Sequence, residues 1–251
     1  MSDDIVSRLA AAGCVAAEAE ATELLAVADD PEQLEVLVTR RTSGEPLAWV
    51  VGAVSFCGIR LDVHRGVYVP RRHTEPLARR AVALLPQGGI AVDLCTGSGA
   101  IACALQAAAP HATVVATDVD PAAVACARQN GVDALLGDLD GPLPAGLLGA
   151  VDIMTAAVPY VPTGELHFLP HDVLAFEPRR ALDGGELGLQ VLSTVVARST
   201  RWVRPGGWLL LELGGDQAAA VAGEMEAAGF GEIRVLSDEE GDNRGIEARR
   251  L

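Results

Sequence analysis

The pattern of apolar and polar positions changes twice along this chain of 251 residues. From about Asp4 to Arg41 the chain is rich in Ala, Leu and Glu, and apolar residues recur at helical spacing. This segment is therefore expected to form a small group of amphipathic helices. From Gly44 to Pro70, β-branched and aromatic residues alternate around Gly58, which predicts a β-hairpin that joins two parts of the molecule.

From about Thr74 onward, apolar strand patterns alternate with helical patterns. The expected strands are Ile90–Leu94, Thr113–Thr117, Val151–Thr155 and Trp208–Glu212. The alternation predicts a parallel sheet with helices on both faces. Pro205-Gly206-Gly207 indicates a turn before the last of these strands. Ile233–Leu236 and Gly245–Arg249 are expected to close the sheet as an antiparallel hairpin.

Composition narrows the classes of function. The chain has 19 basic and 34 acidic residues, a net charge of −15, so nucleic acid and anionic membranes are not expected as partners. The sequence contains no lysine, which excludes a pyridoxal-phosphate Schiff base and a P-loop ATPase. The five cysteines include no C-x-x-C pair, so we expect no metal site. The acidic first residues and the lack of a long apolar run predict a cytoplasmic protein.

The most informative chemical motif runs from Asp93 to Ala102, where an apolar strand enters a glycine-rich turn and then a helix. Gly97 and Gly99 would let the backbone approach a ligand closely, and the helix start offers free N–H groups. These glycines also satisfy the relaxed dinucleotide fingerprint, so alone they do not separate NAD from an adenosyl ligand.

Acidic residues near these glycines bear on the choice between NAD and an adenosyl ligand. Asp93, four residues before Gly97, can order the loop and reach a ligand ammonium group. Asp118 ends the next expected strand and can accept both ribose hydroxyls, in NAD or in an adenosyl ligand. The D-x-x-x-G-x-G form, with Asp138 at the end of a later element, favours S-adenosylmethionine (SAM).

Six segments in order resemble the HemK/PrmC-type protein-(glutamine-N5) methyltransferases, over nearly the whole chain. They are GEPLAWVVGAVSFCGIRLDV, VPRRHTEPL, DLCTGSGAIA, FEPRRALDGGELGL, LELGGDQ and DEEGDNR. The resemblance implies the α/β fold of class I SAM-dependent methyltransferases, a Rossmann-like seven-stranded sheet. It also implies a helical N-terminal region over residues 1–43, a hairpin linker over 44–70 and a SAM-binding domain over 71–251.

The resemblance also implies where SAM binds, as the only cofactor, without a metal or pyridoxal phosphate. Asp118 is expected to hold the ribose, Asp138 and Leu139 the adenine edge, and Gly97 and Gly99 the methionyl backbone. Arg71 and Asp93 are expected at the amino-acid end. The expected cofactor-binding residues are Arg71, Asp93, Cys95, Thr96, Gly97, Gly99, Asp118, Val119, Asp138, Leu139 and Ala157. Cys95 replaces a glycine of the family, and we expect its thiol to pack passively.

One departure from the family lies after the Val151–Thr155 strand. The family has Asn-Pro-Pro-Tyr, whose Asn side-chain carbonyl grips the amide NH2 of a glutamine; this chain has Ala157-Val158-Pro159-Tyr160. Loss of such a positioning hydrogen bond costs about 2.7–4 kcal/mol of transition-state stabilisation. We therefore expect methyl transfer to a small or altered acceptor, with a small-molecule substrate favoured over a protein.

Two alternatives remain at this point. SAM could cyclise to 1-aminocyclopropane-1-carboxylate or azetidine-2-carboxylate and release methylthioadenosine, or the chain could be a SAM-binding protein without catalysis. Tyr160 is the first candidate for a base, and packing on the methionyl part of SAM or on the acceptor is its simpler, slightly favoured alternative. His73 is the second candidate, as a base or as a group that orients the SAM carboxylate.

Overall fold

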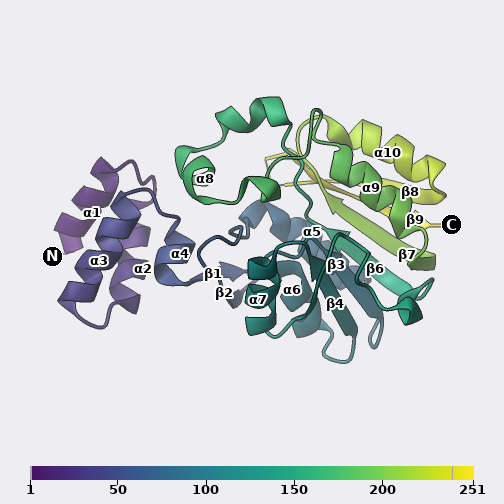
Figure 1. The fold of residues 1–251 in the computed structure, drawn as a ribbon, viewed down its shortest axis with the longest axis horizontal. Coiled ribbons are helices and arrows are strands. Elements are labelled where there is room, and N and C mark those ends of the chain that lie inside the picture. Colours follow the sequence, from purple (N-terminus) through teal and green to yellow (C-terminus); the bar gives the residue numbers. More distant parts are fainter. Residues whose placement is uncertain (1, 239) are drawn as a thin grey trace.

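The computed structural model describes residues 2–238 and 240–251. The N-terminal region is helical, as expected, and forms a compact group at one end of the molecule (Figure 1). Its helices are α1 (Ser2–Ala11), α2 (Ala17–Val27) and α3 (Pro31–Thr42). They share a separate core that includes Leu9, Leu24 and Val38. Asp30 caps α3 by accepting a hydrogen bond from the Gln33 amide, with Pro31 at the first position of the helix.

The expected hairpin is shorter than the 44–70 segment. Its first part forms the helix α4 (Leu47–Val51), and the strands are β1 (Ala53–Phe56) and β2 (Ile59–Asp62). Cys57 and Gly58 form the two-residue turn, both with positive φ, as tight antiparallel hairpins require. The division of the chain at residues 43 and 70 stays a prediction.

Within the described residues, seven strands form one mixed sheet in the order β5-β4-β3-β6-β7-β9-β8. They are β3 (Ile90–Leu94), β4 (Thr113–Asp118), β5 (Asp133–Leu136), β6 (Val151–Ala156), β7 (Val203–Glu212), β8 (Phe230–Ser237) and β9 (Asn243–Arg250). Strands β3 to β7 pair in parallel, and β9 pairs antiparallel with both β7 and β8. The parallel sheet and the closing antiparallel hairpin are therefore confirmed.

Helices cover both faces of the sheet (Figure 1). One face carries α5 (Glu75–Leu84), α6 (Ala100–Ala108) and α7 (Pro121–Gln129), and the other carries α9 (Gln190–Ser199) and α10 (Gln217–Ala227). The helix α8 (His171–Phe176) and the 3-10 turns Arg72–Thr74, Ala145–Leu147, Thr163–Phe168 and Arg179–Ala181 lie in the connections. Among the described residues, no helix combines the length and hydropathy that a membrane crossing needs.

Two strands differ from the sequence-based expectation. The short β5 was not expected, because Asp133-Ala134-Leu135-Leu136 carries no β-branched residue. Strand β7 begins at Val203 rather than Trp208, and Pro205-Gly206-Gly207, where a turn was expected, lies within the strand. Val203 pairs with Val151 and Trp208 with Ile153, so one residue of β6 faces four residues of β7 in an irregular bulge.

Gly99 in the glycine-rich turn allows two helices to pack closely. Its φ is +86°, and an added Cβ would lie 2.9 Å from Cγ2 of Val132 and 3.2 Å from Cβ of Ala127. The glycine therefore allows α6 to start close to the end of α7, and this contact belongs to folding rather than to ligand binding.

We predict that Gly99→Ala destabilises the protein through both backbone strain and this close contact. Gly131→Ala is the matched control, because Gly131 has a φ of +83° but nothing within 4 Å of its added Cβ. Urea unfolding should show a loss of about 1–2 kcal/mol for the control and about 1–3 kcal/mol more for Gly99→Ala. Equal losses for the two variants would contradict the packing role.

Candidate functional site

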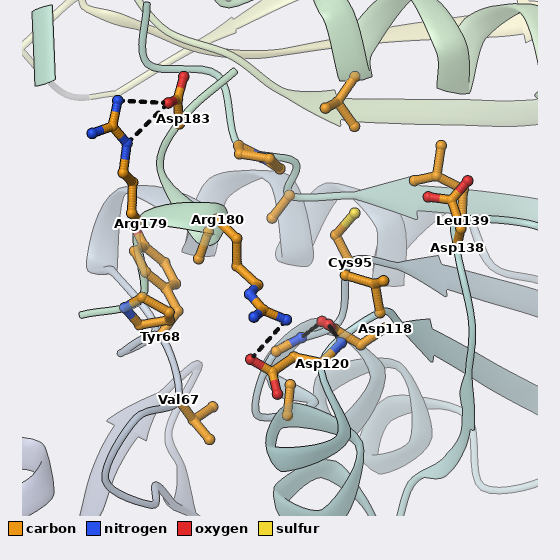
Figure 2. A pocket seen from close by; sticks show the side chains of 18 of the residues that line it. Val67, Tyr68, Cys95, Asp118, Asp120, Asp138, Leu139, Arg179, Arg180 and Asp183 are labelled. Carbon is orange, nitrogen blue, oxygen red and sulfur yellow. Dashed lines mark hydrogen bonds and ion pairs between the residues drawn. The ribbon is translucent and has the colours of Figure 1, made fainter. Parts of the chain in front are cut away.

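A large cavity, the largest of those described here, lies at the carboxyl edge of the parallel strands, the usual place for ligands in open α/β sheets (Figure 2). Its volume is about 710 Å³. It brings together seven of the expected cofactor residues, namely Cys95, Gly97, Asp118, Val119, Asp138, Leu139 and Ala157. Asp93 and Thr96 line a small adjoining cavity, which shares Cys95, Gly97 and Ala157 with the large one.

Asp118 ends β4 and is held by two backbone donors. The Gly97 amide donates to Oδ2 at 2.9 Å, and the Asp120 amide donates to Oδ1 at 2.8 Å. Burial raises the pKa of this carboxyl, and the backbone donors oppose the rise. Because each carboxylate oxygen can accept more than one hydrogen bond, Asp118 remains able to bind a diol inside the cavity.

Asp93 is the most buried carboxylate of the site, with 1% of its surface exposed. Thr96 Oγ1 donates to its Oδ2 at 2.6 Å, and Thr155 Oγ1 donates to its Oδ1 at 2.7 Å. Burial raises the pKa of Asp93 to about 6, and the two hydroxyl groups oppose the rise. The expected ordering role of Asp93 in the glycine-rich loop agrees with these contacts.

The glycine-rich turn places its two glycines in different surroundings. Gly97 has a φ of +56° and open space beside its Cα, and it lines the cavity. Gly99 faces Val132 and Ala127 instead, so its expected contact with a ligand gives way to the packing role described above. Cys95 has a φ of +54°, and burial raises the pKa of its thiol, which keeps the thiol protonated and agrees with passive packing.

A second cavity of about 410 Å³ meets the first at Ala157 and Tyr68, which line both. Its wall includes His73, Tyr160 and Glu212. His73 Nε2 lies 3.4 Å from the Tyr160 hydroxyl and 3.4 Å from Glu212 Oε1. Burial, together with the charge of Glu212, raises the pKa of Tyr160 well above its ordinary value. The phenol therefore keeps its proton near neutral pH, which argues against the expected role of Tyr160 as a base.

Arg71 does not line the large cavity, where it was expected to contact the cofactor. Its Nη2 donates to Oε1 of the buried Glu177 at 2.5 Å, and its guanidinium lies 4.8 Å from the centre of the Tyr68 ring. It borders the second cavity instead. The sequence does not reveal this pairing, because Arg71 and Glu177 are 106 residues apart.

Three further cavity residues were not assigned a role from the sequence. Tyr68 stands between the two cavities, and Glu212 was quoted only as part of the LELGGDQ segment. Arg180 reaches across the large cavity, and its Nη1 lies 3.8 Å from Asp120 Oδ2 (Figure 2). A usable signal existed for Tyr68 and Glu212, because each lies within or directly beside a segment that carries the family resemblance.

Comparison with known proteins agrees with this geometry. Residues 73–136 match the family described as methyltransferase small domain. Release factor glutamine methyltransferase of Geobacter sulfurreducens is 36% identical over 229 residues, which cover 88% of this chain and 80% of the relative. Its counterpart in Mycolicibacterium smegmatis is 38% identical over 232 residues, covering 88% and 82%. A 16S rRNA methyltransferase of T. thermophilus in complex with AdoMet and guanosine has a TM-score of 0.52 at 21% identity, covering 79% and 44%.

These similarities confirm the class I SAM methyltransferase fold and, through the relatives, imply SAM as methyl donor. They contradict three earlier expectations: methyl transfer to a small or altered acceptor, cyclisation of SAM, and a SAM-binding protein without catalysis. The preference for a small-molecule partner over a protein is wrong for the same reason. These expectations gave the side chain missing at position 157 more weight than the similarity to the family along the rest of the chain.

The burial of Asp93 predicts a measurable effect on stability. Its folded-state pKa of about 6 lies above the ordinary 3.8, so the charged form opposes folding by about 3 kcal/mol at neutral pH. Asp93→Asn should therefore raise the free energy of unfolding of the ligand-free protein at pH 7.5. The gain should be full above pH 6 and should shrink as the pH falls towards 4, where the carboxyl is protonated in both states.

Urea titrations of the wild type and Asp93→Asn at several pH values test this. Asp133→Asn, which alters an exposed acid on β5, is the control and should give no such pH-dependent gain. A variant that is less stable than the wild type at pH 7.5 would show that the two threonine hydrogen bonds outweigh the burial of charge.

Proposed function

This chain belongs to the release factor glutamine methyltransferase family, and we propose that it transfers the methyl group of SAM to a glutamine side chain of a release factor. The observation that carries the proposal is the similarity to relatives of that name over more than four-fifths of the chain. The two joined cavities support it, because the reaction needs one site for the cofactor and one for the acceptor amide.

The large cavity is the proposed SAM site. Asp118 holds the ribose hydroxyls while its backbone donors fix its orientation. Asp138, Leu139 and Val119 border the adenine, and Leu139 takes a left-handed φ of +47° at this place. The methionyl part extends past Gly97 towards Cys95, Thr96 and the buried Asp93. Its sulfonium methyl group then faces the junction of the cavities at Ala157.

The proposed reaction is a direct displacement. The nitrogen of the glutamine carboxamide attacks the methyl carbon of SAM, and a new N–C bond forms as the S–C bond breaks. The electron pair of the broken bond stays on sulfur, so S-adenosylhomocysteine leaves. One amide proton leaves the nitrogen for solvent, and N5-methylglutamine remains. The residues of this chain hold the two reactants in line, a contribution that depends on accurate positioning.

We further propose that the chain represents a divergent branch of its family. Ala157-Val158-Pro159-Tyr160 stands where the resemblance implies Asn-Pro-Pro-Tyr. Tyr160 is still firmly held, because its backbone oxygen accepts a hydrogen bond from Gln217 Nε2 at 2.8 Å and Gly184 and Gly188 pack against its backbone. These contacts hold the backbone at Tyr160 although position 157 has no side-chain carbonyl.

We predict that the purified protein, given SAM and a release factor from a bacterium, forms S-adenosylhomocysteine and a release factor heavier by one methyl group. Mass spectrometry of peptides locates the methyl group on a glutamine. A release factor in which that glutamine is replaced by alanine is the control and should stay unmodified. Methylthioadenosine from SAM alone, or no modification of any release factor, would contradict the proposed function.

A further inference from the structure

Glu212 and Ala157 are neighbours at the carboxyl edge of the sheet. Strands β6 and β7 run parallel, and Ala156 pairs with Leu211. Ala157 follows Ala156, and Glu212 follows Leu211. The two residues therefore lie next to each other on neighbouring backbones about 4.8 Å apart. Both residues line the second cavity, and Ala157 also lines the proposed SAM site. Side chains at positions 212 and 157 can thus contact the same ligand in the second cavity.

The Glu212 carboxylate is incompletely satisfied. Only 3% of the residue is exposed, and its Oε1 lies 3.4 Å from His73 Nε2. Its Oε2 is buried and has no hydrogen-bond partner among the described residues. Leaving a buried acceptor unpaired is unfavourable, and more so for a charged group. Glu212 as a residue lines the second cavity, and its carboxylate there favours a ligand that brings an N–H or O–H donor.

The chemistry of a glutamine acceptor matches this cavity. A primary carboxamide has two N–H donors and one carbonyl acceptor. Glu212 offers an acceptor, and the Tyr160 phenol, which keeps its proton, offers a donor 3.4 Å from the same histidine nitrogen. The nitrogen becomes more positive as it takes the methyl group, and a carboxylate nearby stabilises that charge. A glutamate side chain would bring a second negative charge to the same place and be repelled.

We propose that Glu212 accepts a hydrogen bond from the acceptor carboxamide in place of the side chain missing at position 157, and that it selects glutamine over glutamate. This inference rests on the proposed function and adds a specificity-determining residue to it. The methyl-transfer step is unchanged: Glu212 orients the nitrogen that forms the new bond.

The first test measures binding without turnover. A release factor and its variant with glutamate at the acceptor glutamine are titrated into the protein in the presence of S-adenosylhomocysteine. The wild type should bind the glutamine form at least about tenfold more tightly, as expected for one hydrogen bond to a charged group. Glu212→Gln should reduce this preference to less than about threefold, because the repelling charge is gone.

Glu247→Gln is the matched control for that measurement. Glu247 is also buried in the sheet, but Arg80 binds both of its carboxylate oxygens, and it lines neither cavity. This variant should keep the preference of the wild type. An unchanged preference in Glu212→Gln, or a wild type that binds both forms equally, overturns the inference.

The second test uses rescue, which a purely structural role would not produce. Glu212→Leu, close in volume and without an acceptor, should lower kcat about 10- to 100-fold with little change in SAM affinity. Adding Ala157→Asn to Glu212→Leu should raise kcat again by at least about tenfold, because the asparagine places a carbonyl acceptor in the same cavity.

The outcomes separate the inference from the proposed function. Methylation by the wild type, with Glu212→Leu as active as the wild type or not rescued by Ala157→Asn, overturns the role of Glu212 alone. No methylation of any release factor by the wild type overturns both. Thermal unfolding of each variant confirms that the protein is folded.

Discussion

The buried carboxylate of Asp93 ties together the elements on which the cofactor cavity is built. Asp93 lies near the carboxyl end of β3. Its carboxylate accepts hydrogen bonds from Thr96 in the glycine-rich turn and from Thr155 in the neighbouring strand β6. The turn in turn presents the Gly97 amide to Asp118 at the end of β4. Hydrogen bonds of two aspartates thereby link β4, β3 and β6 at the ends of these strands. Removing the Asp93 carboxylate from water opposes this stabilisation.

The parallel pairing of β6 and β7 has a second consequence at the same edge. It places residues 157 and 212 side by side, so loss of a polar side chain on one strand leaves a charged one on the next strand within the same cavity. In the proposed assignment, Glu212 keeps a hydrogen-bond acceptor in this cavity although position 157 carries none.

The sequence predicts the sheet well because its central strands are apolar, β-branched and separated by clear turn and helix patterns. It fails for β5, whose four residues have little strand character, and for α4, whose valines and tryptophan favour a strand until tertiary packing buries them in a helix. Within the site, Asp93, Gly97 and Asp118 belong to one local motif and could be placed from it. The Arg71–Glu177 pair and the cavity around Glu212 join distant segments, so a local motif can single out Glu212 but cannot reveal which residues meet there.

The alanine at the junction of the cavities also bears on selective inhibition. A carboxamide at position 157 would fill space that the methyl group of Ala157 leaves open between the two cavities. In a bisubstrate compound, an adenosyl part is linked to an acceptor mimic. Its linker would pass beside Ala157, where the two cavities meet. A branched linker sized for the methyl group of Ala157 would collide with an asparagine side chain at that position.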